Sequence, residues 1–233
     1  MYLFYLDLHH LQDLLFVQQV ARAAGGDRPP CLLVHGSGDQ AERLLEGHGY
    51  FPTRHPDGRW LVETAEERQF IEQAVRATNR QVIQALNDQV VPSVGIQGGD
   101  RSLLRVEEGQ VRTGRVGWVE ALVSQRVLPV VSTLVPDPAV GQAAEQSAEA
   151  VLVALAEALD ATVAFCLKGS AAGLLDEARQ VRPTVSAAEL VQEPSLPVPD
   201  VVQRVAAQGL PVLLTSVDGF FGQIVPEGTL VKT

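Results

Sequence analysis

The sequence predicts an α/β fold in which a mainly parallel β-sheet is covered by helices on both faces. Segments whose apolar residues recur at helical spacing alternate with short, continuous apolar runs, and glycine-rich turns separate the two. The apolar runs have the composition of strands buried on both faces. They lie at residues 1–6, 31–34, 128–134, 162–167 and 210–215.

The N-terminal segment is predicted to form a right-handed βαβ unit. After the strand at residues 1–6, apolar residues at helical spacing predict a helix over residues 11–24, which two glycines end. The strand at residues 31–34 follows. A glycine-rich turn then leads into another helix, which opens at Asp39 and Gln40.

This turn consists of His35, Gly36, Ser37 and Gly38. It leaves backbone N–H groups free at a helix N-terminus, an arrangement that suits an anion. Gly36 and Gly38 lack a Cβ atom, so a ligand can approach the backbone closely. The alternative is a tight strand-to-helix turn that binds nothing, and the turn alone favours neither interpretation.

A long helix is predicted over residues 64–87. Thr64 and Glu67 have the spacing of a capping box, and an apolar stripe runs along the segment. The elements that follow are a strand at 90–96, a hairpin of 103–106 and 111–113, helices at 119–125 and 142–159, two shorter helices at 186–191 and 200–208, and a final extended segment at 228–231.

Composition excludes several classes of function. The formal net charge is −10 and only two lysines occur, Lys168 and Lys232, which argues against a nucleic-acid partner. No apolar stretch reaches the ~20 residues that span a membrane, and residues 1–8 lack the features of a signal peptide. Cys31 and Cys166 lie in apolar runs and are expected to be buried thiols. We therefore expect a cytoplasmic protein without a membrane partner.

The segment VHGSGDQAERLL, which contains the glycine-rich turn, resembles a VHGGGPQ-type loop of the amino-acid kinase family, in particular of the N-acetylglutamate kinases. Three later segments are similar to that family and follow its order: Gly58-Arg59 before the long helix, residues 95–100 and residues 113–119. The resemblance implies a carbamate-kinase-like three-layer αβα domain over residues 1–233. It further implies an N-terminal substrate and dimer lobe of about residues 1–135, a C-terminal nucleotide-type lobe of about 136–233, and a homodimer formed through residues 64–87.

The same resemblance implies phosphoryl transfer from ATP with Mg to the side-chain carboxylate of an N-acylated acidic amino acid, as in arginine biosynthesis. Arg59 is the candidate to grip a substrate carboxylate, with Arg54 as the alternative because the register is uncertain by two residues. The implied substrate-binding set is His35, Gly36, Ser37, Gly38, Arg59 and Asn79. Lys168 and His9 are the catalytic candidates, and Gly169 and Ser170 are the candidates for nucleotide binding; no metal ligands are predicted.

Several positions depart from the family pattern. A Lys-x-Gly-Gly loop follows the first strand in the family, but here Asp7 stands at the lysine position and His9 and His10 replace the glycines. The two histidines are either new phosphate donors or metal ligands, or simply structural. No second catalytic lysine lies between residues 183 and 208. In place of an asparagine before the helix at 142–159, the polar residues are Gln142, Glu145, Gln146 and Ser147.

These departures leave two other hypotheses open. The chain is a catalytically inactive relative that binds an amino-acid ligand or a partner subunit, or it is an unrelated nucleotide-binding α/β domain. A sheet order unlike that of the kinase family would favour the last hypothesis.

Overall fold

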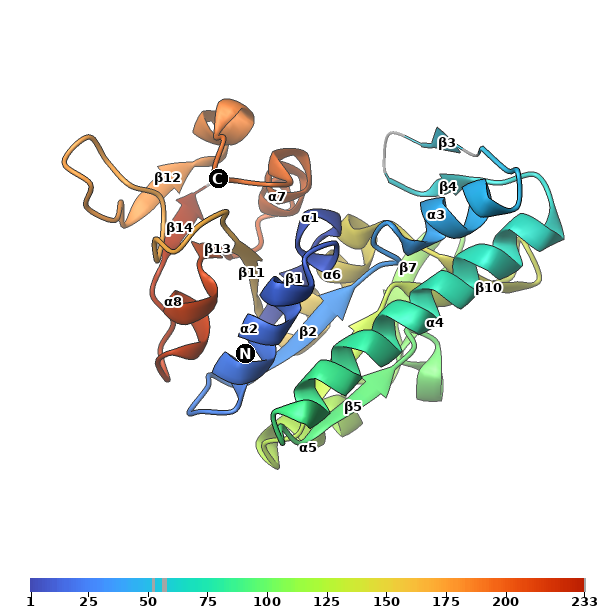
Figure 1. The fold of residues 1–233 in the computed structure, drawn as a ribbon, viewed down its shortest axis with the longest axis horizontal. Coiled ribbons are helices and arrows are strands. Elements are labelled where there is room, and N and C mark those ends of the chain that lie inside the picture. The colour runs from blue at the N-terminus through green and yellow to red at the C-terminus, as the bar shows by residue number, and fades with distance from the viewer. Residues whose placement is uncertain (52, 56–57, 233) are drawn as a thin grey trace.

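An eight-stranded sheet runs through the molecule, and helices cover both of its faces (Figure 1). The computed structural model describes residues 1–51, 53–55 and 58–232. Neighbouring strands of the sheet are parallel, except that β13 and β14 are antiparallel. In order across the sheet the strands are β12 (Thr184–Ser186), β14 (Thr229–Lys232), β13 (Val212–Thr215), β11 (Thr162–Cys166), β1 (Tyr2–Leu6), β2 (Cys31–His35), β8 (Leu128–Ser132) and β5 (Ser93–Ile96).

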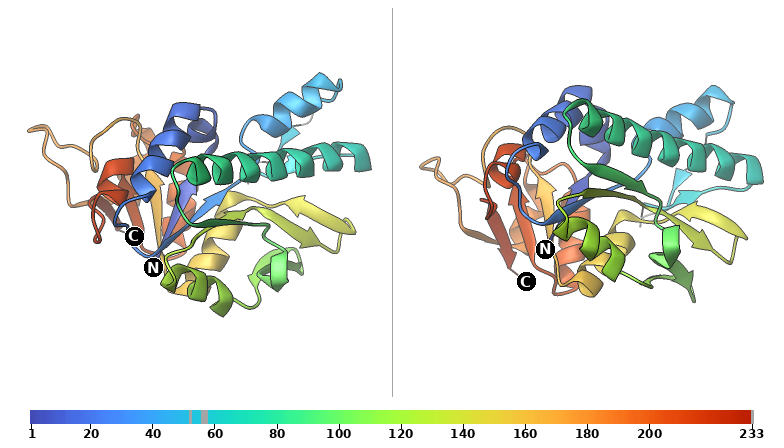
Figure 2. Two further views of the ribbon diagram at one scale, coloured as in Figure 1. Left: turned by 60° about the horizontal axis from the view of Figure 1, so that its bottom comes forward. Right: turned by 90° about the horizontal axis from the view of Figure 1, so that it is seen from below.

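The helices form two layers, one on each face (Figure 2). The first layer contains α2 (Leu14–Ala24), α4 (Ala65–Asp88) and α8 (Val217–Phe221), and the second contains α5 (Gly117–Ser124), α6 (Ala148–Leu159) and α7 (Pro199–Ala207). The predicted α/β fold with a mainly parallel sheet between helical layers is therefore confirmed.

Alternating side chains of β1 show why the sheet needs both layers. Leu3 and Tyr5 pack into the core beneath α6 and α7, whereas Phe4 and Leu6 pack beneath α2, α4 and α8. Phe4 is fully buried, and its ring centroid lies 4.7 Å from that of Phe220 on α8. Both faces of the strand are thus apolar, as its continuous apolar sequence predicts.

Three small antiparallel pairs lie outside the main sheet. They are β3 (Thr53–Arg54) with β4 (Trp60–Leu61), β6 (Leu104–Glu107) with β7 (Gln110–Thr113), and β9 (Leu134–Asp137) with β10 (Gln142–Glu145). Only the β6–β7 hairpin is predicted from sequence. The remaining elements are α1 (Leu8–Leu11), α3 (Gln40–Gly47) and the 3-10 helices η1 (Asp100–Ser102) and η2 (Ala187–Gln192).

The helix predicted over residues 142–159 is wrong in its first part. Residues 142–145 form β10, and α6 begins only at Ala148. Ser147 caps this helix, because its side chain accepts a hydrogen bond from the Ala150 N–H. The two alanines of β10 hide the strand, because alanine favours helices and carries no strand signal. The strand predicted over residues 128–134 is likewise interrupted at Thr133, where the chain leaves the main sheet for β9.

The helix predicted over residues 11–24 is also wrong in its start. The short α1 precedes it, and α2 begins at Leu14 because the Asp13 carboxylate accepts a hydrogen bond from the Leu15 N–H. The long helix, in contrast, agrees with its prediction. Thr64 Oγ1 accepts from the Glu67 N–H at 3.1 Å, and Glu67 Oε2 accepts from the Thr64 N–H at 2.7 Å.

Candidate functional site

The glycine-rich turn lies at the carboxyl end of β2, beside the end of β1. In open α/β sheets this end of parallel strands is where ligands bind, near the point at which the chain connections diverge to both sides. Gly38 has a left-handed backbone with φ +62, and a Cβ atom there would lie 3.2 Å from Leu11 Cβ. The end of α1 therefore covers this part of the turn.

His35 lies behind the turn and is fully buried. Its Nδ1 is 2.8 Å from the Gly36 carbonyl oxygen, and its Nε2 is 2.9 Å from Nδ2 of Asn79 on α4. Burial lowers the pKa of His35 to about 4, so the ring is neutral at pH 7. A neutral ring satisfies both contacts when Nδ1–H donates to Gly36 and Nε2 accepts from Asn79.

Asn79 fastens the same region to the sheet. Its Nδ2 also donates to the Val130 carbonyl oxygen of β8 at 3.0 Å. Its Oδ1 lies against Gly95 of β5, where a Cβ atom would come within 2.2 Å. Through these hydrogen bonds the two residues support the glycine-rich turn from behind, and only 5% of Asn79 and 0% of His35 is exposed.

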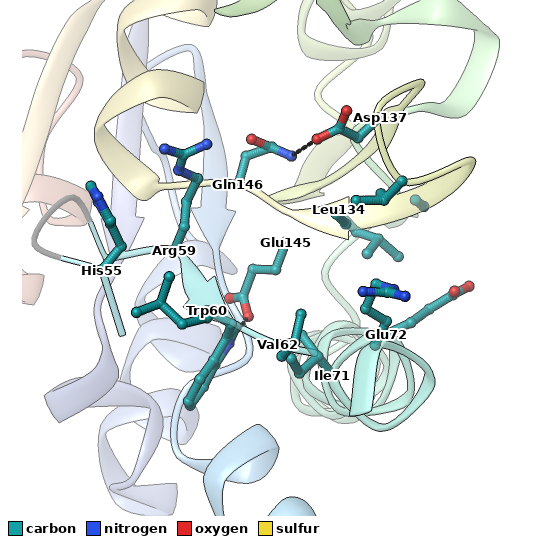
Figure 3. A pocket seen from close by; sticks show the side chains of 15 residues that line it. His55, Arg59, Trp60, Val62, Ile71, Glu72, Leu134, Asp137, Glu145 and Gln146 are labelled. Carbon is teal, nitrogen blue, oxygen red and sulfur yellow. Dashed lines mark hydrogen bonds between the residues drawn. The ribbon is translucent and has the colours of Figure 1, made fainter. Parts of the chain in front are cut away.

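A cavity of about 290 Å³ lies between α4, the segment around β4 and the β9–β10 hairpin (Figure 3). Its lining residues are His55, Arg59, Trp60, Leu61, Val62, Arg68, Ile71, Glu72, Leu134, Asp137, Val140, Ala143, Ala144, Glu145 and Gln146. We call this cavity the β4–β10 pocket.

Two arginines line the β4–β10 pocket. Arg59 precedes β4, and Arg68 lies in the first turns of α4, where its buried Nε has no hydrogen-bond partner among the residues that the structure describes. Arg54, the sequence-based alternative to Arg59, does not line the pocket and instead places its guanidinium 3.6 Å from the Trp60 ring centroid. Of the two candidates, Arg59 lines the pocket and Arg54 does not.

Glu145 joins the pocket to the glycine-rich turn. Its Oε1 accepts from the Ser37 N–H at 2.6 Å and from Thr133 Oγ1 at 3.5 Å, and its Oε2 accepts from Trp60 Nε1 at 2.8 Å. The carboxylate rests directly against Gly36, where a Cβ atom would lie 2.6 Å from Oε1. From sequence, Glu145 is only one of four polar residues before a predicted helix, and no pattern points to Trp60 or Arg68, because β4 and β10 carry no recognisable strand signal.

The end of β1 carries a closed arrangement of its own. Asp7 is 1% exposed, and its carboxylate accepts from the His10 N–H at 3.0 Å and lies 2.8 Å from His10 Nδ1. The His10 ring stacks on Phe16 with centroids 4.1 Å apart. His9, on the same short helix, is exposed. Asp7 therefore caps α1, and its contact with His10 anchors this helix.

The other catalytic and nucleotide-binding candidates lie at the end of β11. Lys168, Gly169 and Ser170 form an exposed turn, held where the Lys168 N–H donates to the Ser195 carbonyl oxygen at 2.7 Å. They do not line the β4–β10 pocket, and neither does His9. The structure thus brings Gly36 and Ser37 of the turn against Glu145. Glu145 and Arg59 both line the pocket, and His35 and Asn79 lie behind the turn.

The residues at this end of the sheet do not fit the phosphates of ATP. Asp7 and Glu145 place carboxylates beside the turn, α1 covers Gly38, and Lys168 is exposed in the turn after β11. No group of three or more His, Cys, Asp or Glu side chains is placed to hold a metal ion among the described residues. In the same part of the chain, no helix is long and apolar enough to cross a membrane.

Comparison with known proteins shows that the chain belongs to the amino acid kinase family, whose model matches residues 14–196. It is 30% identical over 168 residues to acetylglutamate kinase of Aeromonas salmonicida (strain A449), covering 68% of this chain and 63% of that protein. Against acetylglutamate kinase of Solibacter usitatus (strain Ellin6076) it is 28% identical over 193 residues, covering 79% and 73%. The chain thus spans less than two thirds of the Aeromonas protein.

The fold is similar to that of N-acetylglutamate synthase from Neisseria gonorrhoeae, solved with coenzyme A and N-acetyl-glutamate. The TM-score is 0.69 at 15% identity, covering 100% of this chain and 59% of that chain. This likeness shows a shared fold, whereas the match to the family model is what argues against the hypothesis of an unrelated nucleotide-binding domain.

Proposed function

We propose that the chain is an acetylglutamate-kinase-like protein that binds an N-acylated acidic amino acid in the β4–β10 pocket. The position of Arg59 on the wall of a cavity that Glu145 connects to the glycine-rich turn carries this proposal. A planar guanidinium pairs with a carboxylate through two hydrogen bonds, and the apolar side chains of Val62 and Ile71 suit the aliphatic part of such a ligand. The relatives named acetylglutamate kinase support the same class of ligand.

The catalytic form of this proposal is phosphoryl transfer from ATP with Mg to the side-chain carboxylate, of the arginine-biosynthesis type, in the cytoplasm. Lys168, Gly169 and Ser170 would serve it only if the turn after β11 approached the ligand. A second candidate is a relative that binds the amino acid, or a partner subunit, without phosphoryl transfer. The Asp7–His10 pair at the end of β1 favours this second candidate, because the buried Asp7 carboxylate would repel a phosphate bound there.

Calorimetric titration with N-acetylglutamate and then with MgATP separates the two forms. Binding of both, followed by ADP release, supports the kinase; binding of N-acetylglutamate alone supports the second candidate. If neither binds, the proposed ligand is wrong.

Replacing Arg59 by glutamine is expected to weaken N-acetylglutamate binding by about tenfold or more, because a charge-assisted hydrogen bond contributes roughly 1.5–3 kcal/mol. Arg105→Gln, on the exposed β6–β7 hairpin, removes the same charge outside the pocket and is the matched control. Equal affinities for the two variants would show that Arg59 does not hold the ligand.

We also propose that α4 contributes to a homodimer and that the chain is one domain with an N-terminal lobe to about residue 135. α4 is 24 residues long, and its buried residues occupy only the side that faces the sheet and α3. Light scattering is expected to give twice the mass of 25.0 kDa, and Arg80→Glu on the exposed side of α4 is expected to lower it. A monomeric mass for the unmodified protein would contradict the dimer.

A further inference from the structure

Three hydrogen-bond donors from separate segments converge on the Glu145 carboxylate. The Ser37 N–H belongs to the turn after β2, Trp60 Nε1 belongs to β4, and Thr133 Oγ1 lies between β8 and β9. Ser37 and Thr133 are each 1% exposed, so their positions are fixed by the surrounding fold. Converging neutral donors of this kind form a binding site for a carboxylate.

Glu145 fills that site closely. Gly36 lacks a side chain at the point where Oε1 approaches, and a Cβ atom there would lie only 2.6 Å from this oxygen. Glu145 forms no ion pair with any residue that the structure describes, so neutral donors alone hold its charge. Such neutral donors can donate to the carboxylate of a ligand equally well.

We propose that Glu145 is an internal carboxylate that occupies the carboxylate subsite of the β4–β10 pocket, and that a ligand carboxylate binds there only after Glu145 turns away. This inference rests on the proposed function for the identity of the ligand, but the subsite itself is defined by its donors. The Glu145 carboxylate and a ligand carboxylate cannot share one set of three donors, and two negative charges held side by side repel each other. Glu145 therefore competes directly with an acidic ligand.

The contact also links binding to the pocket wall. Trp60 belongs to the β3–β4 pair, and its hydrogen bond to Glu145 connects that pair to β10 across the cavity (Figure 3). When Glu145 leaves the subsite, this connection is broken. Arg59 directly precedes Trp60 and lines the same pocket, so the group that Glu145 contacts and the candidate arginine belong to one wall.

Acetate is the probe that tests the subsite without reference to the natural ligand. Glu145→Ala removes the internal carboxylate and leaves the donors in place, so sodium acetate is expected to raise the melting temperature of this variant above its value in equimolar sodium chloride. The unmodified protein and Glu157→Ala, which loses an exposed carboxylate on α6, are expected to show no such difference. Equal acetate effects in all three proteins would overturn the proposal.

Titration with N-acetylglutamate is the second measurement. It uses Glu145→Gln, so the proposal remains testable if Glu145→Ala does not fold. Glu145→Gln keeps the shape but not the charge, and its amide competes poorly for donors, so its affinity for N-acetylglutamate is expected to exceed that of the unmodified protein by about tenfold. Binding to the unmodified protein without any gain in Glu145→Gln would reject the inference and retain the proposed function. Acetate stabilisation of Glu145→Ala without N-acetylglutamate binding by any variant would retain the subsite and reject the proposed ligand.

Discussion

Acidification from pH 7 to pH 4 is expected to lower the free energy of unfolding by about 3 kcal/mol through His35 alone. The pKa of His35 is lowered by burial from 6.5 to about 4 in the folded chain, whereas the unfolded chain retains the ordinary value. Between these two pKa values the unfolded state binds a proton that the folded state excludes. The stability is therefore full above about pH 6.5 and is lost as the pH falls toward 4.

Urea unfolding at intervals between pH 4 and pH 8 measures this effect. His35→Gln keeps hydrogen-bonding groups near Gly36 and Asn79 but does not titrate, so its loss of stability on acidification is expected to be smaller by about the same 3 kcal/mol. His48→Gln is the control, since His48 is exposed near the end of α3. If the three proteins lose stability in parallel, His35 is not the buried neutral group that its contacts indicate.

The result would also define what His35 does at the site. A neutral His35 donates from Nδ1 to the Gly36 carbonyl and accepts from Asn79, which fixes the orientation of the peptide that precedes Ser37. The Ser37 N–H then points at the carboxylate of Glu145. We therefore propose that His35 and Asn79, both expected from sequence to bind substrate, position the turn.

The strands that continuous apolar runs predict are also the strands that build the sheet, because burial on both faces leaves a strong sequence signal. The candidate pocket was much harder to predict. Its walls include β4, which is only two residues long, and β10, whose two alanines predict a helix. Glu145 reaches the turn over 108 positions of sequence, and no local pattern reports such a contact.

The family resemblance located the substituted positions but not their consequences. By this resemblance Asp7 stands where the family has a lysine, and its negative charge is expected to repel phosphate. That Asp7 instead caps a short helix and holds a buried histidine depends on α1, whose four residues are too few for a periodic signal. The same helix brings Leu11 against Gly38, which no spacing in the sequence indicates.

Replacing Asp7 by alanine is expected to lower the free energy of unfolding by about 2–4 kcal/mol. Loss of the helix cap accounts for about 1 kcal/mol, and the remainder arises because His10 Nδ1 is left without a partner in a buried position. Asp13→Ala is the matched control, since Asp13 caps α2 through one hydrogen bond to Leu15 but is exposed. Its expected cost is at most about 1 kcal/mol.

A double-mutant cycle with His10→Ala isolates the interaction between Asp7 and His10. We expect a coupling energy of about 1 kcal/mol or more, because each residue is the other's buried side-chain partner. An additive cycle, or a cost for Asp7→Ala no larger than that for Asp13→Ala, would contradict a structural role for Asp7. A strong coupling would mean that the end of β1 now holds a helix where a kinase needs room and positive charge for phosphates. Asp7→Lys would then destabilise the chain instead of restoring ATP binding, since it places an unpaired ammonium group at a position that is 1% exposed.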